Sequence, residues 1–338
     1  MNSAAAHSAN VKKDGGTAKN SAPGKSAGKV TDSYVPMRDR FKAWWTGEDV
    51  QLVPQNIGPG VTRKDMAIAI DGDDTSVDED SDNLWCSARL EVIQNIWGEG
   101  FIEPGGAKIT KNLLGWLGLN SRQSVLDLTA ALGGTARSVA SAHGLWMDAL
   151  EPIPALASEG RRLSVSVGLG RQVPISSVDL ETHSFSKARY DAIYSRERLF
   201  TVRNKARLLT GCAEALKETG QILITDYMRS ADVGGAELAA NWGRHEKEMP
   251  STWTMKAYLD CLRELDLRIH IEQDISEEMV EHIYSAWRKI PNMIAEGKFS
   301  HRQISYLVRE GEIWLDRLSA IESGQLIVGR IHAQNTKK

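Results

Sequence analysis

Three acidic residues each follow an apolar segment of this sequence, at positions from which their side chains can contact a bound nucleoside. Asp127, Glu151 and Asp179 each stand at the end of an apolar run. After Asp127, a turn of small residues leads into a helix expected from about Gly134, so that backbone amides and a helix N-terminus face a ligand. A carboxylate at the tip of the second strand, here Glu151, can accept hydrogen bonds from both ribose hydroxyls. The pattern therefore predicts a nucleoside-binding site.

The elements that must position these acids alternate along the chain. Strands are expected at residues 125–127, 144–151, 173–179, 190–197, 220–227, 267–272 and 326–333. Apolar residues at helical spacing predict helices at residues 202–218, 255–265, 277–289 and 304–319. This alternation indicates an α/β fold with a doubly wound, mostly parallel, seven-stranded, Rossmann-like sheet. Such a sheet binds its ligand at the carboxyl ends of the strands.

Four further segments indicate a family. They are Trp97-Gly-Glu-Gly-Phe-Ile-Glu-Pro-Gly-Gly106 before the first strand, Ala131-Leu-Gly-Gly134 in the turn, Ile193-Tyr-Ser-Arg-Glu197 at the fourth strand and Leu223-Ile-Thr-Asp-Tyr227 at the fifth. With these segments, and with the 24 positions from Asp127 to Glu151, the chain from about Gln94 resembles class I S-adenosylmethionine-dependent methyltransferases. Within that class it is similar to the phosphoethanolamine N-methyltransferase type.

The resemblance implies S-adenosylmethionine as the cofactor, and no metal. It assigns cofactor contacts to Asp127, Thr129, Ala131, Gly133, Gly134, Glu151 at the ribose, Asp179 at the adenine, and Arg196. Glu197 borders the acceptor as a candidate catalytic residue, and residues 101–106 with Gly98 form a flap over the methyl group. Methyl transfer from a sulfonium is an in-line displacement, which alignment and exclusion of water promote.

The turn departs from the resembled family, whose pattern is Asp-x-Gly-x-Gly-x-Gly. Thr129 and Ala131 replace its first two glycines. A Cβ at such a position costs on the order of 1–3 kcal/mol if the backbone angles stay unusual. We expect a protein that still binds the cofactor, with weakened affinity. The alternative is a catalytically inactive methyltransferase-like protein that acts as an interaction or regulatory module.

The acceptor side departs further. The resemblance places Ile93 and Thr201 at the positions of a catalytic tyrosine–histidine pair. It places Glu248 and Pro250 where a cation and an aromatic residue contribute to phosphate binding, and it leaves Arg317 as the remaining cation. These differences argue against phosphoethanolamine and predict another small-molecule or lipid-like methyl acceptor.

The resemblance also implies a helical lid over the acceptor at about residues 229–320. His245 in this lid is the histidine nominated as a catalytic base, and a plain surface position is its alternative. Trp242 and Trp253 in the lid, together with Phe101 on the flap, favour an acceptor with apolar or aromatic surface.

The chain divides further by composition. Residues 1–36 are rich in Ala, Ser, Gly and Lys without apolar periodicity, which predicts a disordered tail. Residues 37–70 predict a short helical segment, and residues 71–83 an acidic linker. Residues 84–338 are assigned to the methyltransferase-like domain.

Composition also bears on partners and location. The chain has 338 residues, of which 41% are hydrophobic, and a net charge of −3, and neither favours a nucleic-acid partner. It has no run of about 18 or more apolar residues that predicts a transmembrane segment. Three cysteines without metal-site spacing favour a reducing compartment. We therefore expect a cytoplasmic protein, while the sequence predicts no oligomeric state.

Overall fold

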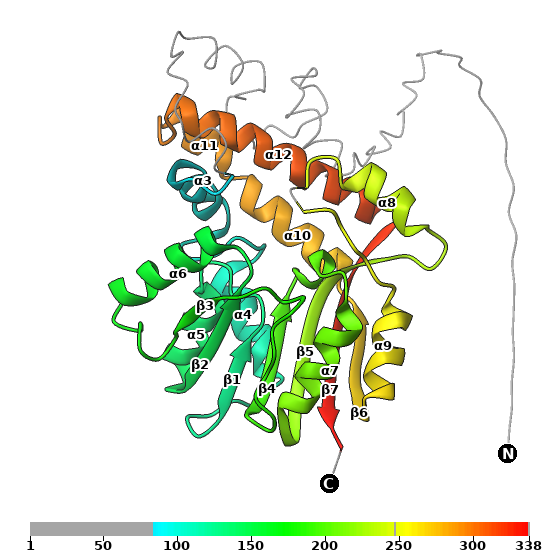
Figure 1. Ribbon diagram of the computed structural model, residues 1–338. Helices are drawn as coiled ribbons and strands as arrows, with labels where there is room; N and C mark the ends of the chain where they lie inside the picture. Colours follow the sequence, from blue (N-terminus) through cyan, green and yellow to red (C-terminus); the bar gives the residue numbers. More distant parts are fainter. Residues whose placement is uncertain (1–83, 247, 337–338) are drawn as a thin grey trace, which may run out of the picture. The chain divides into compact units, whose positions relative to one another are not determined.

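The computed structural model describes residues 84–246 and 248–336, and the fold is given for these (Figure 1). They belong to the second of two units into which the chain divides, Val35–Lys338. The expected tail, short helical segment and acidic linker, residues 1–83, lie outside the described residues.

One sheet of seven strands has the order β3-β2-β1-β4-β5-β7-β6. The strands are β1 (Ser124–Asp127), β2 (Trp146–Glu151), β3 (Ile175–Ser177), β4 (Tyr190–Arg196), β5 (Leu216–Arg229), β6 (Leu267–Asp274) and β7 (Leu326–Asn335). Neighbours pair in parallel except at β7, which runs antiparallel to β5 and β6. The order changes direction between β1 and β4, so a ligand crevice is expected beyond the carboxyl ends of these two strands.

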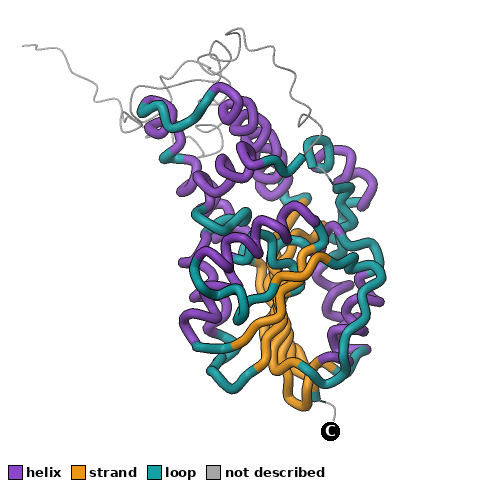
Figure 2. Tube along the Cα trace, turned by 60° about the vertical axis from the view of Figure 1, so that its left-hand side comes forward, coloured by secondary structure: helices purple, strands orange, loops and turns teal. Residues whose placement is uncertain are grey.

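Helices cover both faces of the sheet, which Figure 2 shows between them. The helices are α3 (Ser87–Trp97), α4 (Gly106–Gly115), α5 (Gly134–His143), α6 (Pro154–Ser166), the 3₁₀ helix η3 (Leu199–Thr201), α7 (Lys205–Ala215), α8 (Gly235–Trp242), α9 (Met255–Glu264), α10 (Ser276–Trp287), α11 (Ile290–Ala295) and α12 (His301–Glu322). Successive strand side chains point to opposite faces. Val125 accordingly packs with residues of α4 and α5, and Leu126 with residues of α7 and α9.

A further layer of helices lies beyond the carboxyl ends of the parallel strands (Figure 1). Residues of α3, α8, α10, α11 and α12 share a hydrophobic core with residues of β5 and β7, and this core includes Trp97, Trp242, Trp287 and Trp314. The Trp97 and Trp314 ring centroids are 4.5 Å apart. This layer therefore joins a helix that precedes the sheet to helices from the end of the chain.

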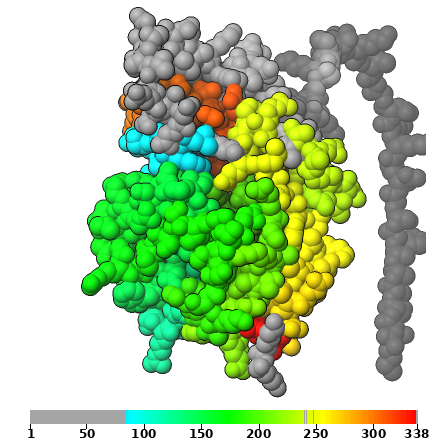
Figure 3. All heavy atoms as spheres, viewed as in Figure 1, coloured from blue at the N-terminus to red at the C-terminus, as the bar shows by residue number. Residues whose placement is uncertain are grey.

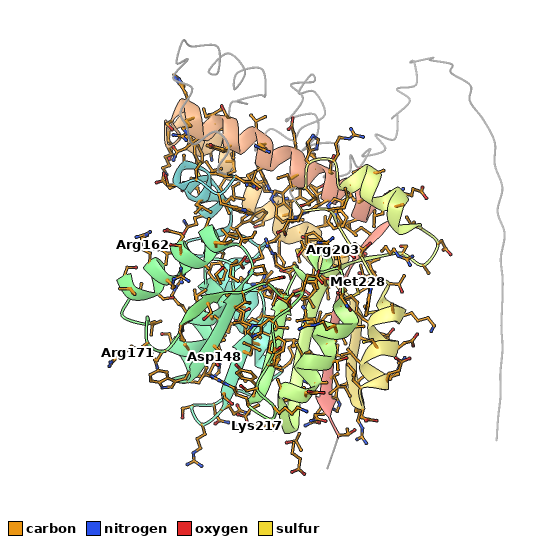
Figure 4. All side chains as sticks on the ribbon, viewed as in Figure 1. Asp148, Arg162, Arg171, Arg203, Lys217 and Met228 are labelled. Atoms are coloured by element: carbon orange, nitrogen blue, oxygen red, sulfur yellow. The ribbon has the colours of Figure 1, made fainter. Side chains whose placement is uncertain are left out.

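Two further views orient this layer. In Figure 4, Met228 near the end of β5 lies on the side of the layer, and Lys217 at the start of β5 lies at the opposite end of the sheet. In the view of Figure 3, the atoms of α3 and α12 lie together above the green atoms of the sheet and its helices. The layer thus covers the end of the sheet where the ligand is expected.

Local sequence explains the longest helix of this layer, α12. Its N-terminus has a capping box, in which the Ser300 side chain accepts from the Gln303 amide and the Gln303 side chain accepts from the Ser300 amide. Ile304, Leu307 and Trp314 are buried on one face, at the spacing of an amphipathic helix. That face packs on α3 and α10.

The expected fold class is confirmed, and each predicted strand is present with small changes of boundary. The helix predicted at residues 202–218 ends earlier, at Ala215, because Leu216 already pairs with Tyr190 of β4. The structure adds α3, α4, α6, α8 and α11, which the sequence pattern did not predict. Within the described part of the chain, no helix combines the length and the apolar character needed to cross a bilayer.

Candidate functional site

Asp127 anchors the start of the turn at the carboxyl end of β1. Its Oδ1 accepts a hydrogen bond from the Thr129 amide at 3.0 Å, and its Oδ2 accepts one from the Tyr194 hydroxyl at 2.6 Å. Burial raises the pKa of Asp127 to about 7, against the effect of both hydrogen bonds. The carboxyl group is therefore fixed by its neighbours on β4 and in the turn.

The two residues that replace glycines in the turn have different conformations. Ala131 has a φ of 50°, in the left-handed region that favours glycine, and its amide donates to Glu151 Oε2 at 2.8 Å. Thr129 has no positive φ. Its Oγ1 lies 3.0 Å from Ser195 Oγ and accepts from the Arg196 amide at 3.2 Å. Thr129 thus ties the turn to β4, whereas Ala131 keeps a backbone conformation suited to glycine.

The glycines that remain in the turn are needed for close contacts. Gly133 has a φ of 76° and caps α5. The Gly134 amide donates to the Gly100 carbonyl at 2.9 Å, and a Cβ on Gly134 would lie only 2.4 Å from that oxygen. The predicted flap therefore touches the turn directly, through backbone atoms.

Glu151 ends β2 with its side chain fully buried. Its Oε1 accepts from the Ile153 amide and its Oε2 from the Ala131 amide, each at 2.8 Å. Burial raises the pKa of Glu151, and the nearby Arg198 opposes this most strongly. Arg198 Nη2 lies 3.8 Å from Glu151 Oε1 and 3.6 Å from Glu248 Oε2. One guanidinium thus links the predicted ribose carboxylate to the segment that follows α8.

Arg196 is buried at the end of β4 and binds the flap region. Its Nη1 donates to the hydroxyls of Thr110 and Thr135 at 3.2 Å each, and its Nη2 to the Pro104 carbonyl at 3.1 Å. Arg196 therefore holds the start of α4, the start of α5 and the flap together.

Glu197 follows Arg196 with a positive φ of 42°. Its Oε1 accepts from the Thr225 hydroxyl at 2.6 Å. Its Oε2 lies 3.5 Å from Arg196 Nη2 and has no hydrogen-bond partner among the residues with defined positions. A strained backbone with an unsatisfied carboxylate oxygen is typical of a functional position.

A cavity of about 130 Å³ opens beside Glu197. Its walls come from α3, the flap, the residues that follow β4, the end of β5, the segment after α8, and α12. The glutamates that line it are Glu103, Glu197, Glu246, Glu248 and Glu310, and the arginines are Arg89, Arg198 and Arg317. Aromatic rings are contributed by Trp85, Phe200, Tyr227 and Trp314.

Two of the three arginines in this cavity are neutralised by close partners. Arg89 forms a buried ion pair with Glu310, which joins α3 to α12. Arg317 binds Glu246 through two hydrogen bonds, at 2.5 Å and 2.9 Å, and Glu246 raises the pKa of Arg317. Since these pairs cancel, the remaining lining has more carboxylates than cations, and we expect it to favour a cationic ligand.

The structure brings several predicted acceptor-side residues to this cavity. Ile93, Thr201, Glu248 and Arg317 all line it. Their correspondence to acceptor-binding positions of the resembled family stays a prediction. Pro250 is buried but is not among the lining residues.

Two predicted site residues lie elsewhere. His245 Nδ1 lies 2.7 Å from Asp316 Oδ2, and its side chain, which is 35% exposed, does not line the cavity. Asp179 is exposed, and its carboxylate accepts from the Glu181 amide at 2.9 Å and the Thr182 hydroxyl at 3.1 Å. The role of His245 as a base and the contact of Asp179 with adenine both stay predictions.

The aromatic residues predicted to line the acceptor site are packed elsewhere. Trp242 lies in the core of the lid layer, with its ring centroid 5.1 Å from that of Phe200. Trp253 packs on Tyr258, and their ring centroids are 5.3 Å apart. Phe101 is likewise buried outside the cavity lining. These three residues therefore do not support a mainly apolar acceptor.

Sequence reasoning missed Glu103, Arg198 and Trp85 in this cavity. Glu103 gave one signal, since it is the only acid in the flap, residues 101–106. Arg198 gave none, because its acidic neighbours Glu151 and Glu248 are 47 and 50 positions away along the chain.

Unsatisfied polar atoms show that the end of β4 suits a polar ligand. Arg196 Nε, Glu197 Oε2, and Nε and Nη2 of Arg198 are buried and lack hydrogen-bond partners in the described structure. Buried polar atoms of folded proteins nearly always have partners, so a bound ligand is expected here. With Asp127 and Glu151 on the adjacent strands, these residues fit a nucleoside cofactor that carries an amino-acid chain. Among residues 84–246 and 248–336, no three His, Cys, Asp or Glu side chains are arranged so that they could hold one metal ion.

Comparison with known sequences and structures places these features in a family context. No family model matches the chain. It is 29% identical over 219 residues to phosphoethanolamine N-methyltransferase of Plasmodium falciparum, a match that covers 60% of this chain and 77% of that protein. Phosphoethanolamine N-methyltransferase 3 of Arabidopsis thaliana is 25% identical over 58% of this chain, and the match spans only 39% of that longer protein.

Solved structures share the fold. The Haemonchus contortus phosphoethanolamine N-methyltransferase 2, in complex with phosphomonomethylethanolamine and S-adenosylhomocysteine, superposes with a TM-score of 0.66 at 19% identity, over 76% of this chain and 60% of that one. A putative sarcosine dimethylglycine methyltransferase from Galdieria sulphuraria superposes with a TM-score of 0.60 at 19% identity, over 74% of this chain and 98% of that one. These likenesses confirm the expected fold.

Proposed function

We propose that this chain, which is similar to methyltransferases in sequence and in fold, transfers a methyl group from S-adenosylmethionine to the nitrogen of a small amine that carries no phosphate. The observation that carries the proposal is the acid-rich cavity at the end of β4, next to the predicted cofactor residues. A cationic ammonium group complements an excess of carboxylates.

The cofactor is assigned to the residues around the turn. Asp127, Glu151 and Arg196 would hold it, together with the backbone of residues 129–134. When bound, S-adenosylmethionine supplies an electrophilic methyl group on a sulfonium sulfur. The flap, which contacts Gly134 through Gly100, excludes water from this end of the sheet. The predicted place of the adenine near Asp179 remains part of the proposal.

The acceptor class follows from the lining of the cavity. The volume of about 130 Å³ suits a compact molecule. Its aromatic walls, which include Trp85 and Trp314, can contact an ammonium group through cation–π interactions. The sequence also allowed a lipid-like acceptor, and the many charged residues in the lining argue for the small amine instead.

The proposal that the acceptor carries no phosphate rests on the arginines that line the cavity. Arg317 and Arg89 are bound by carboxylates of the cavity itself, and Arg198 lies between Glu151 and Glu248. A buried phosphate dianion would need one of these arginines to leave its carboxylate partner. The carboxylate would then stay buried without a compensating charge, which is unfavourable.

The test is a methyl-transfer assay with full-length protein and S-adenosylmethionine labelled in the methyl group. Ethanolamine, dimethylethanolamine, sarcosine and phosphoethanolamine serve as acceptors. We expect label in at least one phosphate-free amine, and none in phosphoethanolamine above the acceptor-free control. Glu197→Gln should lower transfer, and Glu237→Gln on the exposed surface of α8 should leave it unchanged.

Two outcomes would contradict the proposal. Phosphoethanolamine as the best acceptor would overturn the assigned substrate class. No transfer to any amine, despite cofactor binding, would favour the catalytically inactive module over the enzyme.

A cytoplasmic location remains part of this proposal. It is supported by Cys86, Cys212 and Cys261, which are free thiols in the structure, as expected in a reducing compartment.

A further inference from the structure

The flap places an acid in the wall of the cavity. Glu103 is 7% exposed and lies between Ile102 and Pro104, both of which also line the cavity. The carboxylate accepts a hydrogen bond from the Ile102 amide at a long 3.3 Å. Its other oxygen, Oε1, accepts no hydrogen bond from the described residues.

The other glutamates of the cavity are already engaged. Arg89 binds Glu310, and Arg317 binds Glu246. Glu248 lies near Arg198 with 41% of its side chain exposed. Glu197 accepts from Thr225 through Oε1, and its Oε2 forms an ion pair with Arg196 at 3.5 Å. In contrast, no residue of the described structure forms an ion pair with Glu103. Glu103 is therefore the acid most available to a ligand.

Charged and titratable groups from several elements face Glu103. Arg196 and Arg198 lower its pKa, and Glu197 raises it. Tyr194 of β4 also interacts electrostatically with Glu103. Burial has the largest effect and raises the pKa of Glu103 to about 7. The group consequently changes charge near neutral pH, where a general base is most effective.

We propose that Glu103 binds the ammonium group of the methyl acceptor and takes up its proton. This inference rests on the proposed function, because it requires an amine acceptor. The acceptor nitrogen loses a proton to the Glu103 carboxylate, and its lone pair then forms the new nitrogen–carbon bond. The bond between that carbon and sulfur breaks, and its electron pair stays on sulfur. Glu103 would thus do the work that the replaced residues Ile93 and Thr201 cannot do.

Binding of the tetramethylammonium ion tests the cation site without any knowledge of the acceptor. We expect calorimetric titration of the full-length protein, with S-adenosylhomocysteine present, to show binding that strengthens roughly tenfold from pH 6 to pH 8. A carboxyl group with a pKa of about 7 is about one-tenth ionised at pH 6 and nine-tenths ionised at pH 8. Glu103→Gln should remove both the binding and its pH dependence.

Glu99→Gln is the matched control, because Glu99 is an exposed acid four positions earlier and lines no part of this cavity. It should retain the binding of tetramethylammonium and the pH dependence. Absence of tetramethylammonium binding in the wild-type protein, or equal binding in Glu103→Gln, would overturn the inference. Circular dichroism at both pH values checks that the variants are folded.

A kinetic measurement separates a failure of this inference from a failure of the proposed function. With any amine that the transfer assay identifies, Glu103→Gln should lower kcat by about 10²–10⁴-fold at pH 7. The wild-type rise of kcat with pH near 7 should be lost, while S-adenosylhomocysteine still binds. Unchanged kcat and pH profile in Glu103→Gln would leave the methyltransferase intact and exclude Glu103 as the base.

Discussion

At the residue scale, the candidate site contains buried acidic side chains that accept hydrogen bonds from neighbouring groups. Asp127 is held by Tyr194 and the turn, and Glu151 by two backbone amides. The sequence predicted both positions, because an acid at the end of an apolar run is a local signal. It did not predict the hydrogen bond from the Tyr194 hydroxyl to Asp127, which joins residues 67 positions apart.

The two glycine replacements in the turn should have opposite effects when they are reversed. Ala131→Gly should leave the free energy of unfolding unchanged or raise it by up to ~1 kcal/mol, because a Cβ is disfavoured at a φ of 50°. Thr129→Gly should lower it by ~1–3 kcal/mol, since Ser195 and the Arg196 amide lose a buried partner. Urea unfolding of each single variant measures this. Equal effects of the same sign would show that the two positions are equivalent.

At the element scale, helices that are far apart in the sequence form the walls of the proposed acceptor cavity. The ion pair between α3 and α12 joins Arg89 to Glu310, 221 positions later. No local pattern predicts such a contact, so the sequence did not indicate that α3 and the preceding Trp85 line the cavity. The strands were easier to predict, because alternation and length identify them within a few residues. No local pattern predicts the contact of His245 with Asp316 either, since the two residues are 71 positions apart.

The ion pair between Arg317 of α12 and Glu246 after α8 should determine the net charge of the cavity wall at this point. Glu246→Gln should release the guanidinium into the cavity, so that inorganic phosphate binds measurably at millimolar concentration. Thermal unfolding should also occur at lower temperature, because the variant loses a largely buried ion pair. Calorimetric titration with phosphate gives the first result, with Glu264→Gln at the exposed end of α9 as control. Phosphate binding to the wild-type protein as strong as to Glu246→Gln would contradict this account.

At the scale of the whole molecule, the proposed cofactor residues lie on the sheet and the turn after β1, and the proposed acceptor cavity also has walls from α3 and α12. The strand order, with the change of direction between β1 and β4, brings Asp127, Glu151 and Glu197 to one end of the sheet. Fold class was predictable, since seven strands and their helices follow from periodicity. The charge of the acceptor site was not, because it depends on which acids and arginines pair across the lid.

The central claim is that this chain binds S-adenosylmethionine at the turn after β1, and calorimetric titration tests it most directly. We expect both S-adenosylmethionine and S-adenosylhomocysteine to bind at one site per chain. Glu151→Gln should weaken both by roughly tenfold or more, in keeping with ~1.5–3 kcal/mol for hydrogen bonds to a charged group. Glu159→Gln on the neighbouring helix α6 should bind like the wild type. No heat with either compound at millimolar concentration, from protein shown to be folded, would contradict the account.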